Sequence, residues 1–270
     1  EFLKDIRNDL IPMSEFLPTL NYLDIPVVDW CNLKCKSCGL ACNLVKEGMA
    51  TSFERYAADM KQLTTKFGNV ESIHFMGGEP FLSKELLEYI KVASECFPQA
   101  PLYITTNGTL LDRLADDMFE SIRKYDVMIC ISFYPIFEEK IYKIVKLLER
   151  KKVRFYVSEE KKEFYKFFSF KEQNAIDTWK RCSFSGCHYL QEGRIYGCGA
   201  PITMKRLSRI ADMDWADQEV GYDIYSNMSG WEINCKLNSP FETCKHCTAE
   251  MTSVKWEIAG ERACIEDYFV

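Results

Sequence analysis

The sequence predicts an α/β fold in which a partial (β/α) barrel of five or six parallel strands is followed by a small cysteine-rich α+β cap. Three observations support this. Short β-branched or aromatic runs alternate with amphipathic segments over residues 25–158, this regularity then stops, and a second group of cysteines begins at residue 182. The chain is therefore divided into an N-terminal extension at 1–24, a barrel at 25–180 and a cap at 181–270.

Five short apolar runs predict the strands of the barrel. They are IPVVDW (25–30), SIHFM (72–76), LYITT (102–106), VMICISF (127–133) and VRFYV (153–157). Between them, apolar residues recur at helical spacing in the four segments 53–67, 86–97, 111–122 and 137–148. Strand, helix and strand in alternation predict right-handed βαβ units, whose chemistry lies at the carboxyl ends of the strands.

The later part of the chain follows a different pattern. Residues 159–181 mix charged and aromatic side chains without a clear period. The stretch CSFSGCHYLQEGRIYGCG (182–199) predicts a β-hairpin that turns at Glu192 and Gly193, with cysteines on both sides. A variable stretch then leads to CKHC (244–247).

Composition narrows the range of partners. The formal net charge is −6 and the basic residues form no stripe, so nucleic acid and anionic membrane surfaces are not expected. No apolar run approaches the roughly 20 residues of a membrane span, and no signal peptide is visible, so we expect a cytoplasmic protein. Thirteen cysteines in a chain of this kind indicate metal binding rather than a disulfide scaffold.

The first cysteine motif, C-x3-C-x2-C, directly follows the first predicted strand and contains Cys31, Cys35 and Cys38. Three thiolates are one fewer than a closed zinc site or an all-cysteine iron–sulfur site requires. A 4Fe–4S cluster held by these three would leave one iron open to a chelating small molecule. Zinc is the alternative, with Cys42 or a distant residue as fourth ligand. We interpret Cys42 as a structural or incidental thiol.

A second motif, MGGEP (76–80), follows the second predicted strand. Its glycines would let the backbone approach a ligand closely, although alone it would equally suit a plain turn before a helix. Together with the cysteine motif, with TTNG (105–108) and with Ser132, it resembles the radical S-adenosylmethionine (radical SAM) superfamily over residues 25 to about 158.

This resemblance implies that the three cysteines ligate a 4Fe–4S cluster and that S-adenosylmethionine chelates its open iron. It implies that the amino group of S-adenosylmethionine meets Gly77, Gly78 and Glu79, and that its methionine or ribose part meets Asn107 and Ser132. The family usually has an aromatic residue just before the third cysteine, where this chain has Ser37. The adenine would therefore pack partly against other residues.

The C-terminal cysteines resemble the twitch domain, the form of the SPASM domain that holds one cluster. The resemblance implies one auxiliary 4Fe–4S cluster, ligated by Cys182, Cys198, Cys244 and Cys247. Cys187 is the alternative to Cys182 as a ligand. A structural zinc site is the alternative to the cluster. Where SPASM proteins continue with further cysteines, this chain has Ser253 and Glu257, so no second auxiliary cluster is expected.

The overall plan is similar to that of 2-deoxy-scyllo-inosamine dehydrogenase, and less so to the enzyme that forms cyclic pyranopterin. The resemblance implies oxidation or epimerisation of a small polar molecule such as a sugar or cyclitol, with a flavodoxin- or ferredoxin-type reductant. Glu159 and Tyr134 follow strands at the active edge and are candidate proton acceptors. For an epimerisation, Cys130 or Cys235 is a candidate hydrogen donor.

Two other functions stay open. The chain could modify a ribosomally made peptide by thioether formation, epimerisation or crosslinking. About 24 residues precede the first predicted strand, too few for a winged-helix module that recognises a leader peptide. This favours a small substrate, unless residues were removed before Glu1 or the recognition domain is a separate protein. Alternatively, the clusters could be purely structural or electron-carrying, but the three-cysteine loop combined with GGEP argues for catalysis.

Overall fold

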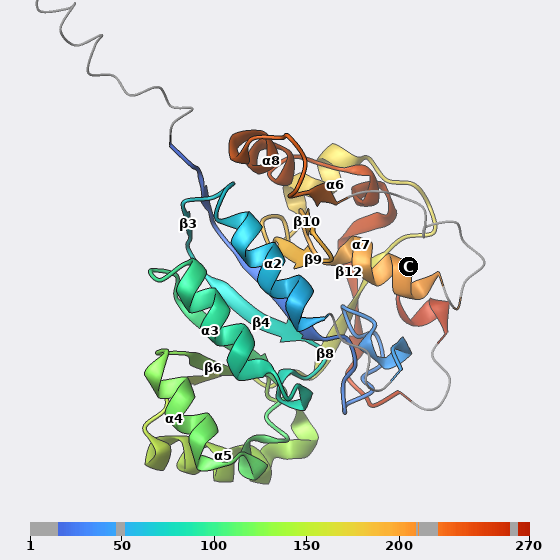
Figure 1. The fold of residues 1–270 in the computed structure, drawn as a ribbon. Helices are drawn as coiled ribbons and strands as arrows, with labels where there is room; N and C mark the ends of the chain where they lie inside the picture. Colours follow the sequence, from blue (N-terminus) through green and yellow to red (C-terminus); the bar gives the residue numbers. More distant parts are fainter. Residues whose placement is uncertain (1–15, 47–51, 209, 211–220, 260–263) are drawn as a thin grey trace, which may run out of the picture.

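The computed structural model describes residues 16–46, 52–208, 210, 221–259 and 264–270 (Figure 1). Its centre is an eight-stranded sheet in the order β11-β10-β9-β2-β4-β5-β6-β7. The strands are β2 (Leu23–Val28), β4 (Ile73–Gly77), β5 (Leu102–Thr106), β6 (Met128–Ile131), β7 (Phe155–Val157), β9 (Tyr189–Gln191), β10 (Arg194–Tyr196) and β11 (Tyr222–Asp223).

The part of this sheet from β2 to β7 confirms the predicted α/β fold. Each of its strands pairs in parallel with the next. Within the described residues, β7 and β11 are the two edges of the sheet, so the barrel is partial and open. A short parallel pair, β1 (Thr19–Leu20) with β3 (Asn69–Val70), lies outside the main sheet.

One face of the parallel strands is covered by helices, as the apolar periodicity predicts. These are α2 (Phe53–Leu63), α3 (Leu86–Cys96), α4 (Asp116–Lys124) and α5 (Glu138–Lys151). Figure 1 shows α2 and α3 lying over β2 and β4. The predicted segment 111–122 is split, because a 3-10 turn at Leu111–Arg113 precedes α4. None of the helices in the described ranges is long and apolar enough to cross a membrane.

Side chains of the strands alternate between this helical face and the opposite face, which we call the inner face. Ile73 and Phe75 belong to the main core with the helices, so His74 and Met76 lie on the inner face. Because paired residues in neighbouring strands share a face, the register adds four further inner-face residues: Asp24, Tyr103, Thr105 and Cys130.

The predicted hairpin is present, and its turn residues Glu192 and Gly193 both have positive φ, at 51° and 75°. Such a turn matches the twist of the flanking strands. The hairpin does not stay within a separate cap, because β9 pairs in parallel with β2 through Tyr189 and Asp24. The predicted barrel and cap therefore share one sheet.

The remaining C-terminal elements pack beside this sheet. They are α6 (Ala175–Arg181), α7 (Ala200–Leu207), α8 (Gly230–Leu237) and an antiparallel pair of β8 (Glu163–Phe168) with β12 (Cys247–Lys255). The sequence pattern missed β8 and α6. Aromatic residues occupy both faces of β8, as in EFYKFF, so no clean alternation marks it as a strand.

Candidate active site

A cavity of about 140 Å³ opens where the strands from β2 to β6 end. Its lining comes from each of the predicted motifs, because parallel strands bring their carboxyl ends to one edge. The lining residues are Cys31, Leu33, Cys35, Cys38, Cys42, Met76, Gly77, Gly78, Glu79, Thr105, Thr106, Asn107, Ser132, Tyr134 and Phe164. All residues predicted for the first cluster and for S-adenosylmethionine are thus brought together.

The two glycines are required by a close approach of two backbone segments. A Cβ atom on Gly78 would lie 1.7 Å from the carbonyl oxygen of Trp30, and one on Gly77 would lie 2.2 Å from that of Val28. The N–H of Gly78 donates to Val28 O at 2.7 Å, and that of Glu79 donates to Trp30 O at 3.1 Å. The glycines therefore let the chain after β4 lie directly against the chain that enters the cysteine loop.

Glu79 is a fully buried carboxyl group held in one orientation by three donors. The Thr106 hydroxyl and the Phe81 N–H donate to Oε1 at 2.6 and 3.3 Å, and the Asn107 N–H donates to Oε2 at 2.9 Å. Burial raises the pKa of Glu79 to about 7, although these hydrogen bonds oppose the rise. A cationic ligand group in the cavity would favour the ionised form.

Asn107 connects the loop after β5 to the cysteine loop. Its Nδ2 donates to Asn32 Oδ1 at 2.9 Å and contacts Cys31 Sγ at 3.7 Å. Its Oδ1 accepts from the N–H and the hydroxyl of Thr109 at 2.9 and 2.6 Å. The side chain is thereby fixed at the wall of the cavity, which Ser132 also lines.

The thiols of the cysteine loop differ in their surroundings. Burial raises the pKa of both Cys31 and Cys35 to about 12, whereas a hydrogen bond with Cys42 lowers that of Cys38 to about 6. Within the described ranges, no three His, Cys, Asp or Glu side chains converge closely enough to hold one metal ion. A 4Fe–4S cluster uses one thiolate per iron and its positive irons favour deprotonated thiols, so this donor set fits a cluster.

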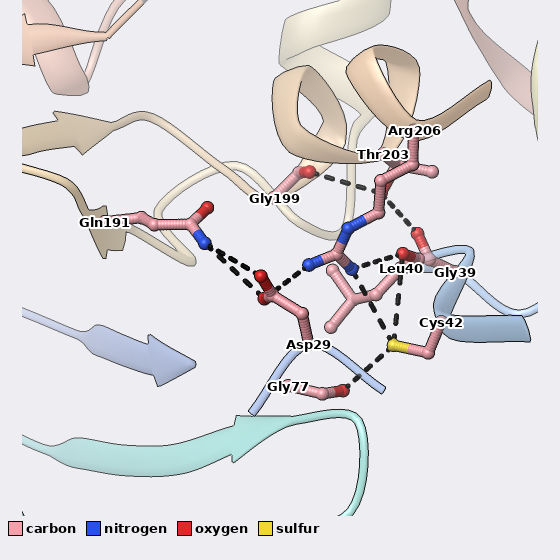
Figure 2. A network of polar contacts seen from close by, with 9 residues as sticks. All are labelled: Asp29, Gly39, Leu40, Cys42, Gly77, Gln191, Gly199, Thr203 and Arg206. Atoms are coloured by element: carbon pink, nitrogen blue, oxygen red, sulfur yellow. Dashed lines mark hydrogen bonds and ion pairs between the residues drawn. The ribbon is translucent and has the colours of Figure 1, made fainter. Parts of the chain in front are cut away.

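Helix α7 fixes the far side of the cysteine loop through Arg206 (Figure 2). The buried guanidinium pairs with Asp29 Oδ1 at 2.6 Å and donates to Leu40 O at 2.6 Å. It also lies 3.7 Å from the sulfur of Cys42, whose thiol donates to Gly77 O at 3.3 Å. Cys42 is therefore part of a network that holds the loop against the strands. No local pattern in the sequence marks Arg206.

The C-terminal segment covers the other side of the loop. Ser37 has a positive φ of 53° and donates its hydroxyl to Asp267 O at 2.6 Å, so the position before the third cysteine faces this segment. Trp256 lies against Cys35, with its ring stacked on Tyr134 at 4.9 Å. The aromatic side chains near the cysteines therefore come from distant parts of the chain.

The four cysteines predicted for the auxiliary site also come together. They line a small cavity of about 20 Å³, and Cys187 is not among its lining residues. Burial raises the pKa of Cys198 to about 12, and the nearby Cys182 and Cys244 add to the rise. Cys187 has both Asp24 and Cys182 as charged neighbours: burial, then Asp24 and then Cys182 raise its pKa to about 11.

Of the four residues predicted to act on substrate, only Tyr134 lines the active-site cavity, and Cys235 is exposed on α8. Burial, and then the neighbouring cysteines, raise the pKa of Tyr134 well above 10, so at neutral pH its hydroxyl keeps its proton and can donate a hydrogen bond but cannot act as a base. Glu159 is exposed to solvent. Cys130 lies on the inner face of β6 opposite Thr105, and burial raises its pKa. The roles of Glu159 and Cys130 stay predictions.

Asp24 is an acidic residue that the motif analysis did not single out. It is buried on the inner face, and its Oδ1 has no hydrogen-bond partner among the described residues. Burial raises its pKa to about 7, with a hydrogen bond from Tyr22 acting in the opposite sense. A carboxyl group at the start of an otherwise apolar strand was the signal that could have identified it.

Comparison with known proteins places these features in a family. Residues 25–158 match the model of the radical SAM superfamily. The GTP 3′,8-cyclase of Alkaliphilus oremlandii is 29% identical over 107 residues, which are 38% of this chain and 32% of the relative. That of Campylobacter jejuni strain RM1221 is 33% identical over 108 residues, 39% of this chain and 33% of the relative. The chain thus spans about a third of the length of these relatives.

Solved structures extend the similarity of fold. BtrN in complex with AdoMet and 2-DOIA covers 86% of this chain and 93% of its own, at 15% identity and a TM-score of 0.50. A structure of anSMEcpe with bound AdoMet covers 52% of this chain and 43% of its own, at 22% identity and a TM-score of 0.42. With the family model matched across the barrel strands, the chain belongs to the radical SAM superfamily.

Proposed function

We propose that this enzyme uses a radical generated from S-adenosylmethionine to oxidise or epimerise a small polar molecule such as a sugar or cyclitol. Membership of the superfamily implies S-adenosylmethionine and one 4Fe–4S cluster. We assign the cluster to Cys31, Cys35 and Cys38. When bound and reduced, these cofactors supply a 5′-deoxyadenosyl radical that removes a hydrogen atom from the substrate.

One observation carries this proposal, namely that a single cavity collects the thiols, the carboxyl group and the amide that the reaction needs. The three thiols of the cysteine loop stand on one side, and Glu79 stands among neutral donors as a partner for the ammonium group of S-adenosylmethionine. Asn107 contacts Cys31 and Asn32, and so connects the loop after β5 to the cysteine loop. Preorganised groups of this kind lower the cost of binding a flexible cofactor.

The auxiliary cluster is the finer part of the proposal. Its support is that Cys182, Cys198 and the pair Cys244 and Cys247 line one small cavity although they come from three separate places in the fold. Cys182 ends α6, Cys198 precedes α7, Cys244 lies in the 3-10 helix Glu242–His246, and Cys247 begins β12. This arrangement favours Cys182 over Cys187 as a ligand.

The proposed oxidation of an alcohol removes two electrons and two protons from the substrate, and each needs an acceptor. A secondary alcohol would lose one hydrogen atom to the radical and one proton to a base, and an auxiliary cluster held by the four cysteines would accept the remaining electron, which would leave a ketone. The base stays a prediction, because Glu159 is exposed and Asp24, which pairs with His74 near the amino end of β2, does not line the cavity.

The reductant is proposed to be a flavodoxin- or ferredoxin-type protein. A cleft of about 640 Å³ shares Cys31 with the active-site cavity, and Lys34, Lys46 and Arg113 lie among its lining residues. Their positive charges would attract an acidic partner to the side of the cluster.

Anaerobic reconstitution with S-adenosylmethionine and a panel of cyclitols, sugars and peptides tests the proposal. We expect 5′-deoxyadenosine that carries deuterium from a labelled cyclitol or sugar. Oxidation gives a product two electrons more oxidised than the substrate, whereas solvent deuterium at the product carbon without a change in oxidation level indicates epimerisation. If only the peptides in the panel are modified, the proposed substrate is wrong and the enzyme acts on a peptide. If the wild type forms no more 5′-deoxyadenosine than the Cys31→Ala variant does, the enzyme assignment is wrong.

A further inference from the structure

The indole of Trp256 is directed at a cysteine sulfur of the active site. Its Nε1–H donates to Cys35 Sγ at 3.3 Å, in a buried position, across 221 residues of sequence. We propose that this hydrogen bond raises the reduction potential of the cluster held by Cys35, which makes Trp256 a positioning and tuning residue of the enzyme. The inference rests on the proposed function in one respect, that Cys35 is a cluster ligand.

Backbone hydrogen bonds between distant segments of the chain place Trp256 opposite Cys35. Ile258 and Cys35 form an antiparallel bridge. The N–H of Lys36 donates to Glu257 O at 3.0 Å, and the N–H of Trp256 itself donates to Lys162 O at 2.8 Å. Because β12 begins at Cys247 and ends at Lys255, this one strand connects the two groups of cysteines.

The ring is also fixed by its neighbours. It stacks on Tyr134 with ring centroids 4.9 Å apart and an interplanar angle of 21°. Tyr134 in turn meets Phe164 edge to face at 6.0 Å. Trp256 is 6% exposed and Cys35 is 5% exposed, so water competes little for the hydrogen bond. A hydrogen bond in such a low-dielectric setting is stronger than one at the surface.

The direction of the effect follows from charge. Reduction brings one electron from the external reductant to the cluster and increases the negative charge on its thiolate sulfurs. An N–H donor stabilises the reduced form more than the oxidised form, so it raises the potential. Trp256 thereby makes the site easier to reduce, while the three thiolates keep their places.

The test compares Trp256→Phe with Trp231→Phe under anaerobic conditions. Phenylalanine at 256 keeps an aromatic ring against Tyr134 but removes the donor. Trp231 lies on α8, is 37% exposed and donates to Phe16 O, so its variant is a matched control remote from the cysteines. The readout is a potentiometric titration followed by EPR of the signal that changes when S-adenosylmethionine is added.

At a fixed potential, we expect Trp256→Phe to lower the ratio of reduced to oxidised cluster about tenfold, which is about 59 mV for one electron. Trp231→Phe should titrate like the wild type. Equal midpoints for the two variants, at equal iron content, would overturn the inference and leave the proposed function intact. A wild-type protein that binds no cluster at the N-terminal cysteines would instead refute the proposed function.

A second measurement uses the wild-type protein, so it does not depend on whether a variant folds. In wild-type protein with nitrogen-15 in its indole rings, pulsed EPR of the reduced cluster should detect a nitrogen coupling, because Nε1 of Trp256 lies 3.3 Å from a ligand sulfur. Absence of this coupling would refute the hydrogen bond directly.

Discussion

Replacing Glu79 by Gln should change how the stability of the protein depends on pH. Burial raises the pKa of this carboxyl group from 4.5 to about 7. The folded state therefore holds its proton up to a higher pH than the unfolded state does. The favourable contribution of the protonated group is fully present below pH 4.5 and is lost as the pH rises through 7.

The magnitude follows from these two pKa values. At 1.36 kcal/mol per pH unit, the Glu79 contribution to the free energy of unfolding should fall by about 2.5 kcal/mol between pH 5 and pH 8. Glutamine does not titrate, so in Glu79→Gln this fall should be absent. Urea unfolding of metal-free, reduced protein at both pH values measures it. Because all other groups titrate alike in both proteins, the difference between variant and wild type isolates Glu79.

Binding of S-adenosylmethionine should show the opposite trend in the wild type. An ammonium group prefers the ionised carboxylate, so the affinity should rise about tenfold from pH 6 to pH 8, in proportion to the ionised fraction. Glu79→Gln should bind weakly at both pH values, as measured by equilibrium dialysis. The reasoning fails if the stability difference between variant and wild type is the same at pH 5 and pH 8.

Three further changes test the architecture around the two cysteine groups. Cys182→Ala should reduce the iron content from about eight to about four atoms per chain, whereas Cys187→Ala should retain all of it; the reverse result would move the ligand. Gly78→Ala should lower the free energy of unfolding by about 3 kcal/mol, because its Cβ would collide with a backbone carbonyl, and an unchanged urea midpoint would contradict this. Arg206→Met removes the ion pair of Asp29, which is half-buried and keeps only longer contacts with Gln191, and should cost about 3 kcal/mol. Arg154→Met at an exposed ion pair should cost at most about 1 kcal/mol, and similar losses for both would refute the role of the network.

Local patterns in the sequence were sufficient for much of the fold. Apolar runs and helical spacing depend only on nearby residues, and they predicted the parallel strands and the four helices that cover them. The spacing of Cys31, Cys35 and Cys38 and the order of GGEP and TTNG after successive strands predicted where the site lies. The turn at Glu192 and Gly193 was readable because a glycine between two strand-like runs readily adopts positive φ, as Gly193 does here.

Tertiary structure alone decided the contacts between distant segments. The pairing of β9 with β2 brings the hairpin into the barrel sheet, Arg206 reaches Cys42 across 164 residues, and Trp256 reaches Cys35 across 221. A periodic pattern shows which face of an element is buried but not which segment covers it. The sequence by itself therefore located the cysteine loop and predicted the chemistry that we propose for it. Only the folded chain determined which donors surround its sulfurs, because those donors arrive through long-range packing that no local spacing encodes.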